Sequence, residues 1–593
     1  MTNTKAITLD TLIEPDSLAR GLSEMYITFE RSRVNKRAEW QEIQEYIFAT
    51  DTGKTRNSSL PWSNKTTIPK LCQIRDNLFS NYIAALFPRR RWLTWEGSVK
   101  EAEQAGKRDA IISYMNWVID RPEFYSEISK LIADYIDYGN CFASVEWVDQ
   151  RSLDGDKEGY VGPMPKRISP LDIVFDPTAN SFSASPKLIR SIVSLGELKD
   201  MIERGRAESP EELEATQSLF KKIMEDRRTI REYTGEVLSE KDSIYEVAGF
   251  TSYREYMQSP YAEILTFFGD YYDSEKDEYH RNKVIKIVDR NTVIGVWDNP
   301  SFFGRAPIYS VGWRLRPDNL WAMGPLDNLV GMQYRIDHLE NMKSDVFDII
   351  AYPPLIVRGE VQDFDWRPME RIYIGDEGDV KMLVPDTQAL QADNQIALLE
   401  SKMEEMAGSP REAMGFRTPG EKTMYEVQRL EAAAGRIFQN KISGFERDLL
   451  EPLLNAMLEL AKRNMNATVI RIFDDQNKIA LFETLTAQDI TGSGRIRPIA
   501  ARHFAEKAIQ VQNLTNFFGS AAGMDPAIKQ HFSSVELARM WEQILDLQDY
   551  GLVEPFIQIS EQADGQKLQV ASQEQIAQTV NTPSGINFDA DEQ

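Results

Sequence analysis

The chain has 593 residues, of which 42% are hydrophobic, and a formal net charge of −24 at pH 7. This length exceeds what one hydrophobic core supports, so we expect several domains, and the acidic balance excludes a protein that grips nucleic acid over its whole surface. The sequence has no secretion-signal pattern and no apolar run of membrane-spanning length, so we expect a soluble protein made inside a cell, with no membrane partner.

Helical periodicity covers residues 16–49, 70–87, 100–120 and 122–138, and Gly139-Asn140 then begins a strand-like run, 141–148. Residues 166–193 are extended and rich in turns, whereas residues 197–256 have the charged helical pattern of an exposed arm or of packed surface helices. Strand character returns in residues 262–272 and 282–290, which an acidic loop joins as a hairpin. The sequence therefore predicts an α+β fold that is mainly helical.

One long helix is predicted between Gly324-Pro325 and Pro353-Pro354, because proline suits a first helical position and two prolines cannot continue a helix. The helix would run from Pro325 to Ala351 and span roughly 40 Å at about 1.5 Å per residue. Its apolar stripe consists of Leu326, Leu329, Met332, Ile336, Leu339, Met342, Val346 and Ile349. Such a stripe needs a packing partner. The candidate packing residues are Leu329, Ile336, Leu339 and Val346.

The segment after this helix alternates between short strands, helices and loops. Strands are predicted at 355–357, 371–374 and 380–384, a helix at 388–407 and a loop at 408–418. A capping box, Thr418-Pro419-Gly420-Glu421, begins a further long helix with expected bends at Ser443-Gly444 and Pro452. A strand at 469–473, a tight loop at 491–494, helices at 501–549 and a polar tail complete the chain.

Motifs of catalysis are weak in this sequence. Gly53-Lys54-Thr55 matches the end of a phosphate-binding loop, but Phe48 stands where the first glycine should be. The two cysteines and four histidines stand at no metal-ligand spacing, and no Gly-x-Ser-x-Gly elbow exists. The acidic residues between Asp273 and His280 could hold a divalent cation or form a solvated hairpin loop. We expect a protein that is not an enzyme and binds no metal or other cofactor.

Four stretches, taken in order, resemble the portal (head-to-tail connector) proteins of tailed bacteriophages. The stretch 137–145, DYGNCFASV, resembles the passage of that family from helix to strand, and 167–177, RISPLDIVFDP, resembles the extended segment that follows it. Residues 313–358 resemble the first stem helix running into the clip, and residues 418–446 resemble the helix after the tunnel loop. The resemblance extends from about Trp62 to Asp549.

This resemblance implies a wing, stem, clip and crown architecture that forms a ring, usually of twelve subunits, at one capsid vertex. The implied domains are an N-terminal wing region (1–324), first stem helix (325–351), clip (352–387), second stem helix (388–407), tunnel loop (408–418), return helix and wing (419–495), crown (496–560) and flexible tail (561–593). Double-stranded DNA would pass through the ring without sequence-specific recognition. The implied partners are a packaging terminase, a major capsid or scaffolding protein and a tail adaptor. The protein would assemble in the host cytoplasm and reside in the virion.

Two groups of residues carry the contacts that this resemblance implies. The tunnel loop offers Arg411 and Arg417 for phosphate and Met414 and Phe416 for apolar contact; packing against a neighbour is the alternative. Between Glu360 and Val380 acidic residues outnumber Arg367 and Arg371, and they include Asp363, Asp365, Glu370, Asp376, Glu377 and Asp379. These six would form an acidic docking face on the clip, or the surface of an ordinary solvated β insert.

Two other functions remain as alternatives. A subunit of an ATP-driven packaging motor would need a working phosphate loop and clustered metal-binding acids. A capsid or scaffolding protein would not be expected to supply the order helix, insert, helix, loop and helix between residues 325 and 465. The portal interpretation accounts for that order.

Overall fold

The computed structural model divides the chain into two compact units, which we treat separately. The first comprises residues 1–468 and 485–501, and the second comprises residues 469–484 and 502–593. The structure describes residues 9–11, 15–48, 64, 66–87, 92–98, 107–149, 160–204, 210–232, 255, 258–273, 277–299, 304–351, 353–359, 375–382, 391–407, 438–465, 468–474 and 479–498. The following paragraphs concern these residues.

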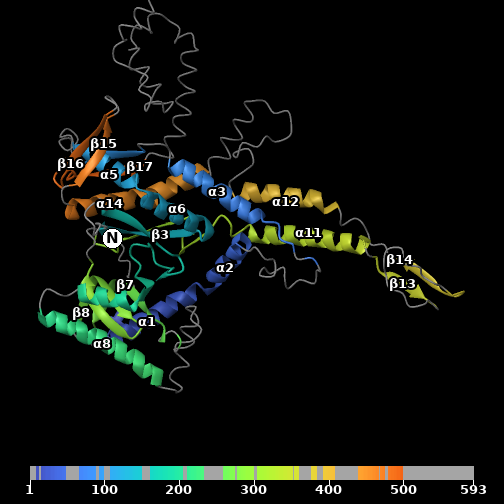
Figure 1. Cartoon of the computed structure of the whole chain (residues 1–593), viewed down its shortest axis with the longest axis horizontal. Coiled ribbons are helices and arrows are strands. Elements are labelled where there is room, and N and C mark those ends of the chain that lie inside the picture. Colours follow the sequence, from blue (N-terminus) through green and yellow to red (C-terminus); the bar gives the residue numbers. More distant parts are fainter. Residues whose placement is uncertain are drawn as a thin grey trace, which may run out of the picture. The chain divides into compact units, whose positions relative to one another are not determined.

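The chain mixes helices with several small sheets (Figure 1). The helices are α1 (Pro15–Ser32), α2 (Val34–Phe48), α3 (Lys70–Leu86), α5 (Lys107–Ile119), α6 (Pro122–Asp137), α7 (Leu195–Arg204), α8 (Pro210–Glu232), α11 (Val330–Ala351), α12 (Asp393–Met406), the π-helix η4 (Glu446–Leu450) and α14 (Glu451–Asn464). The strands are β1 (Leu9–Thr11), β2 (Leu93–Gly97), β3 (Asn140–Asp149), β4 (Val161–Ile168), β5 (Ile173–Phe175), β6 (Lys187–Ser194), β7 (Tyr261–Asp273), β8 (Glu278–Val288), β9 (Thr292–Asp298), β10 (Ile308–Gly312), β11 (Arg314–Arg316), β12 (Asn319–Met323), β13 (Leu355–Arg358), β14 (Asp379–Met382), β15 (Thr468–Asp474), β16 (Ile479–Leu485) and β17 (Gly494–Pro498).

The largest sheet has the strand order β5-β6-β7-β8-β9, and β1 pairs with the outer part of β7 in parallel. Helices cover both faces of this sheet, and successive side chains of β7 point to these two opposite faces. Leu265 and Phe267 pack against α1, whereas Ala262 and Ile264 pack with residues of α7 and α8. The segment 197–256, predicted as an exposed arm or as packed surface helices, therefore supplies two helices that pack on this sheet; residues 233–254 lie outside the described part.

A second sheet, β10-β3-β4, packs against α6 and α14. A hydrophobic cluster that includes Trp40, Tyr138, Phe142, Ile168, Phe175 and Trp321 joins it to β5 and α2. Gly139, between α6 and β3, has a φ of +75°, and a Cβ there would lie 2.6 Å from the Gly324 nitrogen. Glycine is needed here for both reasons, and the close approach brings the chain before α11 onto the end of α6.

Helix α11 has 22 residues and begins at Val330, so the predicted start at Pro325 is wrong. Residues 325–329 form turns, in which the Leu329 amide donates to the Leu326 carbonyl over 2.9 Å. In this segment the Asp327 carboxylate accepts hydrogen bonds from the Gly324 amide and from Lys36 of α2. Leu329 therefore lies in a turn before the helix. The predicted end at Ala351, before the two prolines, is confirmed.

The described helix after residue 438 continues past Ser443-Gly444 and Pro452, the two places where bends were predicted. A π-helical turn, η4, lies directly before α14, in which Pro452 occupies the first turn. Proline has no N–H for the bond to residue 448, and the wider turn accommodates that loss. The tunnel loop, residues 419–437, the predicted helices at 501–549 and the polar tail lie outside the described residues.

Lys187, at the start of β6, is a buried lysine with 1% of its surface exposed. Its Nζ donates to the Ser185 carbonyl over 2.8 Å and lies 4.6 Å from the ring centre of Phe182. Burial, together with the nearby Arg305 charge, lowers the pKa of Lys187 to about 7. The folded protein therefore disfavours the charged form of this side chain.

We expect Lys187→Met to raise the free energy of unfolding by roughly 2 kcal/mol at pH 7, because each unit of pKa shift corresponds to about 1.4 kcal/mol and the lost hydrogen bonds offset part of the gain. The pKa of an unfolded lysine is near 10.5, so the penalty in the native chain is absent above that value and grows as the pH falls toward 7. Urea unfolding at pH 7 and pH 9.5 checks this. The free energy of unfolding of the wild type should rise between these two pH values. Lys199→Met, a control at an exposed position, should keep this rise, whereas Lys187→Met should lose it. The same pH dependence in both variants would contradict the prediction.

Candidate assembly and docking segment

Helix α11 changes character along its length. In its first half Ile336 and Leu339 are buried within the chain, as is Leu329 in the turn before it. Val346 is half-buried, and beyond it Phe347 exposes 49% of its surface and Ile350 exposes 40%. Of the four predicted packing residues, three therefore serve the chain's own core. The exposed apolar side chains lie in the half of the helix near Ala351.

The β13–β14 hairpin follows α11 along the chain and lies beyond its end (Figure 1). Its strands pair antiparallel, from Leu355 opposite Met382 to Arg358 opposite Asp379. Both strands lie in this two-stranded sheet alone, an arrangement that has marginal stability in water. Ile356, Val357 and Met382 are nevertheless exposed. A partner that covers these side chains would stabilise the hairpin.

The predicted docking acids are described in part. Asp376, Glu377 and Asp379 are exposed in the turn before β14 and at its first residue. Asp379 faces Lys381 at 3.9 Å. Asp363, Asp365 and Glu370 lie outside the described residues. The three described acids are therefore accessible at the hairpin.

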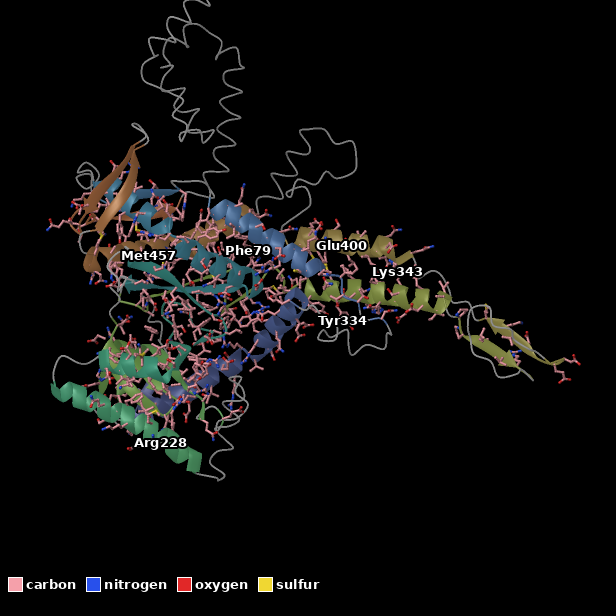
Figure 2. The ribbon with its side chains drawn as sticks, viewed as in Figure 1. Phe79, Arg228, Tyr334, Lys343, Glu400 and Met457 are labelled. Atoms are coloured by element: carbon pink, nitrogen blue, oxygen red, sulfur yellow. The ribbon has the colours of Figure 1, made fainter. Side chains whose placement is uncertain are left out.

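Helix α12 runs beside α11, and Lys343 joins the two helices (Figure 2). Its Nζ lies 2.7 Å from the Asp393 carboxylate and 3.3 Å from that of Glu340. The hydrogen bond to Asp393 is the main cause that raises the pKa of Lys343. On α12, Ile396 and Met403 are buried, whereas Leu398 and Met406 expose 55% and 50% of their surface. The helix pair α11 and α12 therefore buries some of its apolar side chains and leaves others exposed.

A buried ion pair anchors the inner end of α12. Lys70, the first residue of α3, places its Nζ 2.5 Å from the Glu404 carboxylate, and both side chains are less than one-tenth exposed. The Gln73 amide oxygen accepts a second hydrogen bond from Lys70 at 3.1 Å. This contact joins α12 to the body of the first unit through α3, which packs on α2, α6 and α11.

A row of polar side chains on α11 binds the extended segment that precedes α3. Gln333, Asp337 and Asn341 have no exposed surface, although each is polar or charged. Asn341 pairs with both backbone groups of Thr66: its Oδ1 accepts from the Thr66 amide over 2.7 Å and its Nδ2 donates to the Thr66 carbonyl over 3.0 Å. Each such side chain gives a hydrogen-bond partner to a backbone group that would otherwise be buried without one.

The row continues on both sides of Asn341 at steps of four residues. Toward the start of the helix, Asp337 accepts from the Ile68 amide over 3.0 Å, and Gln333 accepts from the Leu71 amide over 3.0 Å. Toward its end, Asp345 accepts from the Asn64 amide over 2.9 Å. We call Gln333, Asp337, Asn341 and Asp345 the polar ladder. Sequence reasoning placed Asp337 and Asp345 outside the apolar stripe and missed the ladder.

The predicted tunnel-loop residues, Arg411, Met414, Phe416 and Arg417, lie outside the described residues. Within the described part, no group of three or more His, Cys, Asp or Glu side chains could hold a metal ion. In the acidic hairpin near β8, His280 stacks on Tyr271 with ring centres 4.5 Å apart. None of the helices described here is both long and apolar enough to cross a membrane.

The segment α11, β13, β14 and α12 thus combines a braced helix pair, uncovered apolar side chains and exposed acids, which suits assembly and docking. Comparison with known proteins adds no family: no protein-family model and no curated protein matches the sequence.

Proposed function

We propose that the chain is a portal subunit, and that copies of it form the ring-shaped DNA conduit at one vertex of a tailed-bacteriophage capsid. The observation that carries this proposal is the uncovered apolar surface of α11, the β13–β14 hairpin and α12. Exposed large apolar side chains that gather in one segment of a chain are typical of surfaces that bind another protein. In a ring, the same side chains contact the next copy, and a heterologous contact of this kind closes on itself after a whole turn.

The charge of the chain supports a conduit for double-stranded DNA. Tight binding to phosphates requires many lysine and arginine side chains, and it would slow the movement of DNA. A chain of net charge −24 keeps DNA hydrated and centred instead. Arg411 and Arg417 of the tunnel loop supply local contacts to phosphate, with Met414 and Phe416 beside them, and no base is recognised.

The hairpin acids support a docking role at the end of the stem. Asp376, Glu377 and Asp379 form, with Asp363, Asp365 and Glu370, the face that receives the packaging terminase and later the tail adaptor. The capsid or scaffolding protein surrounds the ring at its vertex. The ring assembles in the host cytoplasm and stays in the virion.

The purified chain tests this function directly. Light scattering coupled to size-exclusion chromatography should give a mass that is one fixed multiple of 67.9 kDa, and negative-stain images should show rings with a central hole. Twelve copies is the number that the family resemblance implies. A stable monomer that hydrolyses nucleotide would contradict the proposal.

We expect Phe347→Ser/Ile350→Ser to abolish ring formation while the single chain stays folded, because both side chains are exposed and their loss removes apolar contact with the next copy. Light scattering measures the oligomer and circular dichroism measures the fold. Leu315→Ser is the matched control, since Leu315 is equally apolar, 53% exposed and outside the stem segment. Rings formed equally by both variants would show that α11 does not carry the contact.

A further inference from the structure

The polar ladder is a positioning device for α11. An extended chain advances about 6.6 Å over two residues, and an α-helix advances about 6.0 Å over four. Residues 64, 66 and 68 therefore stay in step with residues 345, 341 and 337 over three rungs. The segment runs antiparallel to the helix, and the Leu71 amide, at the start of α3, bonds to Gln333 as the last rung.

The hydrogen bonds of the polar ladder define the register between α11 and the facing segment, which apolar packing alone does not do. Moving the segment by one residue would place side chains where Thr66 and Ile68 now offer their amides. Asn341 donates and accepts at the same residue, so it also distinguishes an amide from a carbonyl in the facing chain. A buried polar group left without its partner destabilises the protein, so the register is defined along the helix.

The polar ladder extends into the outer half of α11, where apolar side chains are exposed. Asp345 and Asp348 accept hydrogen bonds from Asn64 over 2.8 Å, close to the exposed Phe347 and Ile350. In this outer half, α12 supplies the Lys343–Asp393 ion pair and the ladder supplies the opposing restraint. The direction of α11 relative to α3 thus depends on both.

We propose that the polar ladder sets the direction in which α11 presents its apolar side chains to the next copy, and thereby sets the number of subunits in the assembly. The assembly part rests on the proposed function, while the positioning of α11 within one chain does not. A change of a few degrees in the direction of each helix changes the angle between neighbours and hence the number that closes a ring.

The test uses two ladder variants and two controls. Asn341→Ala removes the central rung, and Asp345→Ala removes an outer, half-exposed rung whose loss leaves the core intact. Alanine favours the helix, so neither change weakens α11 itself. Arg335→Ala, at an exposed position on the same helix, is the matched control. Asp345→Asn keeps an acceptor for the Asn64 amide and should restore the wild-type result.

The first measurement is the distance between spin labels at Glu123→Cys on α6 and at Ala351→Cys, the exposed last residue of α11, in a Cys72→Ser background, with labelled chains diluted in unlabelled ones. We expect the distance distribution to broaden at least twofold in Asn341→Ala and in Asp345→Ala, and to stay narrow in both controls. An unchanged width in both ladder variants overturns the positioning role, whether or not the chain forms rings.

The second measurement is the mass of the assembled particles. Wild type and controls should give one subunit number, whereas the ladder variants should give two or more. Broadened distances with a single, unchanged subunit number would overturn the link to assembly and leave the positioning role standing. A wild-type chain that never assembles would refute the proposed function, and with it this link, independently of the distance result.

Discussion

Glu404→Leu is expected to lower the free energy of unfolding by about 3–5 kcal/mol, the usual cost of breaking a buried ion pair from one side. The Lys70 ammonium would remain at the buried junction of α3 and α12, where its side chain is 7% exposed. The Gln73 amide oxygen, 3.1 Å away, carries no charge to balance it. Urea unfolding of the single chain measures the loss.

The double variant Lys70→Met/Glu404→Leu distinguishes the effect of an unpaired buried charge from the effect of lost side-chain packing. With both charges replaced by apolar side chains of similar length, the stability should return to within about 1 kcal/mol of wild type, because a buried ion pair contributes little over an apolar one. A single variant as stable as wild type would mean that the pair is not formed in solution. A double variant as unstable as the single one would point to lost packing of α12 instead.

Local sequence signals predicted the helices and strands whose determinants lie close together in the sequence. Pro353-Pro354 end α11 at Ala351, because a helix cannot continue through them. A high content of Ile, Val, Phe and Tyr located β7 and β8 within a few residues. Two of the short strands predicted within the insert, at 355–357 and 380–384, correspond to β13 and β14. The apolar spacing on α11 also indicated the burial of Ile336 and Leu339. Each of these signals is contained in a short stretch of chain.

The start of α11 could not be read from the same kind of signal. Asp327 in the turn before α11 bonds to Lys36, which is 291 positions earlier in the sequence. Pro325 permits a helix start but does not require one. The local sequence around Pro325 therefore does not decide between a helix and a turn. The same applies to η4, whose wider turn depends on the helix staying packed through Pro452.

The polar ladder shows what periodicity alone leaves out. Its members stand four residues apart, so the pattern is visible in the sequence, but a polar stripe on a helix usually faces solvent. Its partners are the backbone amides of residues 64, 66, 68 and 71, whose side chains follow no periodic pattern. Backbone hydrogen bonding is independent of side-chain identity, and so the pairing leaves no trace in one of the two segments.

A second large loss of stability is expected from a substitution where α8 contacts the largest sheet. The hairpin between β8 and β9 has two residues other than glycine with positive φ, Asp289 at 49° and Arg290 at 58°. Such a conformation is strained for most side chains and persists where surrounding contacts hold it. Here Arg227 of α8 binds Asp289 through two nitrogens, over 2.7 and 3.1 Å, and Arg290 binds Glu263 over 2.8 and 2.9 Å. All four side chains are buried.

Arg227→Met should therefore lower the free energy of unfolding by about 3–5 kcal/mol, because it leaves the Asp289 carboxylate in a buried site without the guanidinium that balances its charge. The Tyr261 carbonyl also loses a 2.7 Å hydrogen bond at the start of β7. Urea unfolding gives the size of the loss, and limited proteolysis locates it. Cleavage within α8 should become faster while α3 and α11 stay protected, because the Arg227 contacts hold α8 on β7 and on the β8–β9 turn.

The double variant Arg227→Met/Asp289→Asn tests the electrostatic cause. Asparagine tolerates the left-handed conformation and still accepts the hydrogen bond that Asp289 receives from the Glu263 amide over 3.2 Å, but it is neutral. Part of the lost stability should return. If it does not, the loss arises from packing of the arginine side chain. Slow cleavage of α8 in the single variant would instead show that its apolar residues, led by Ile223, suffice to hold it on the sheet.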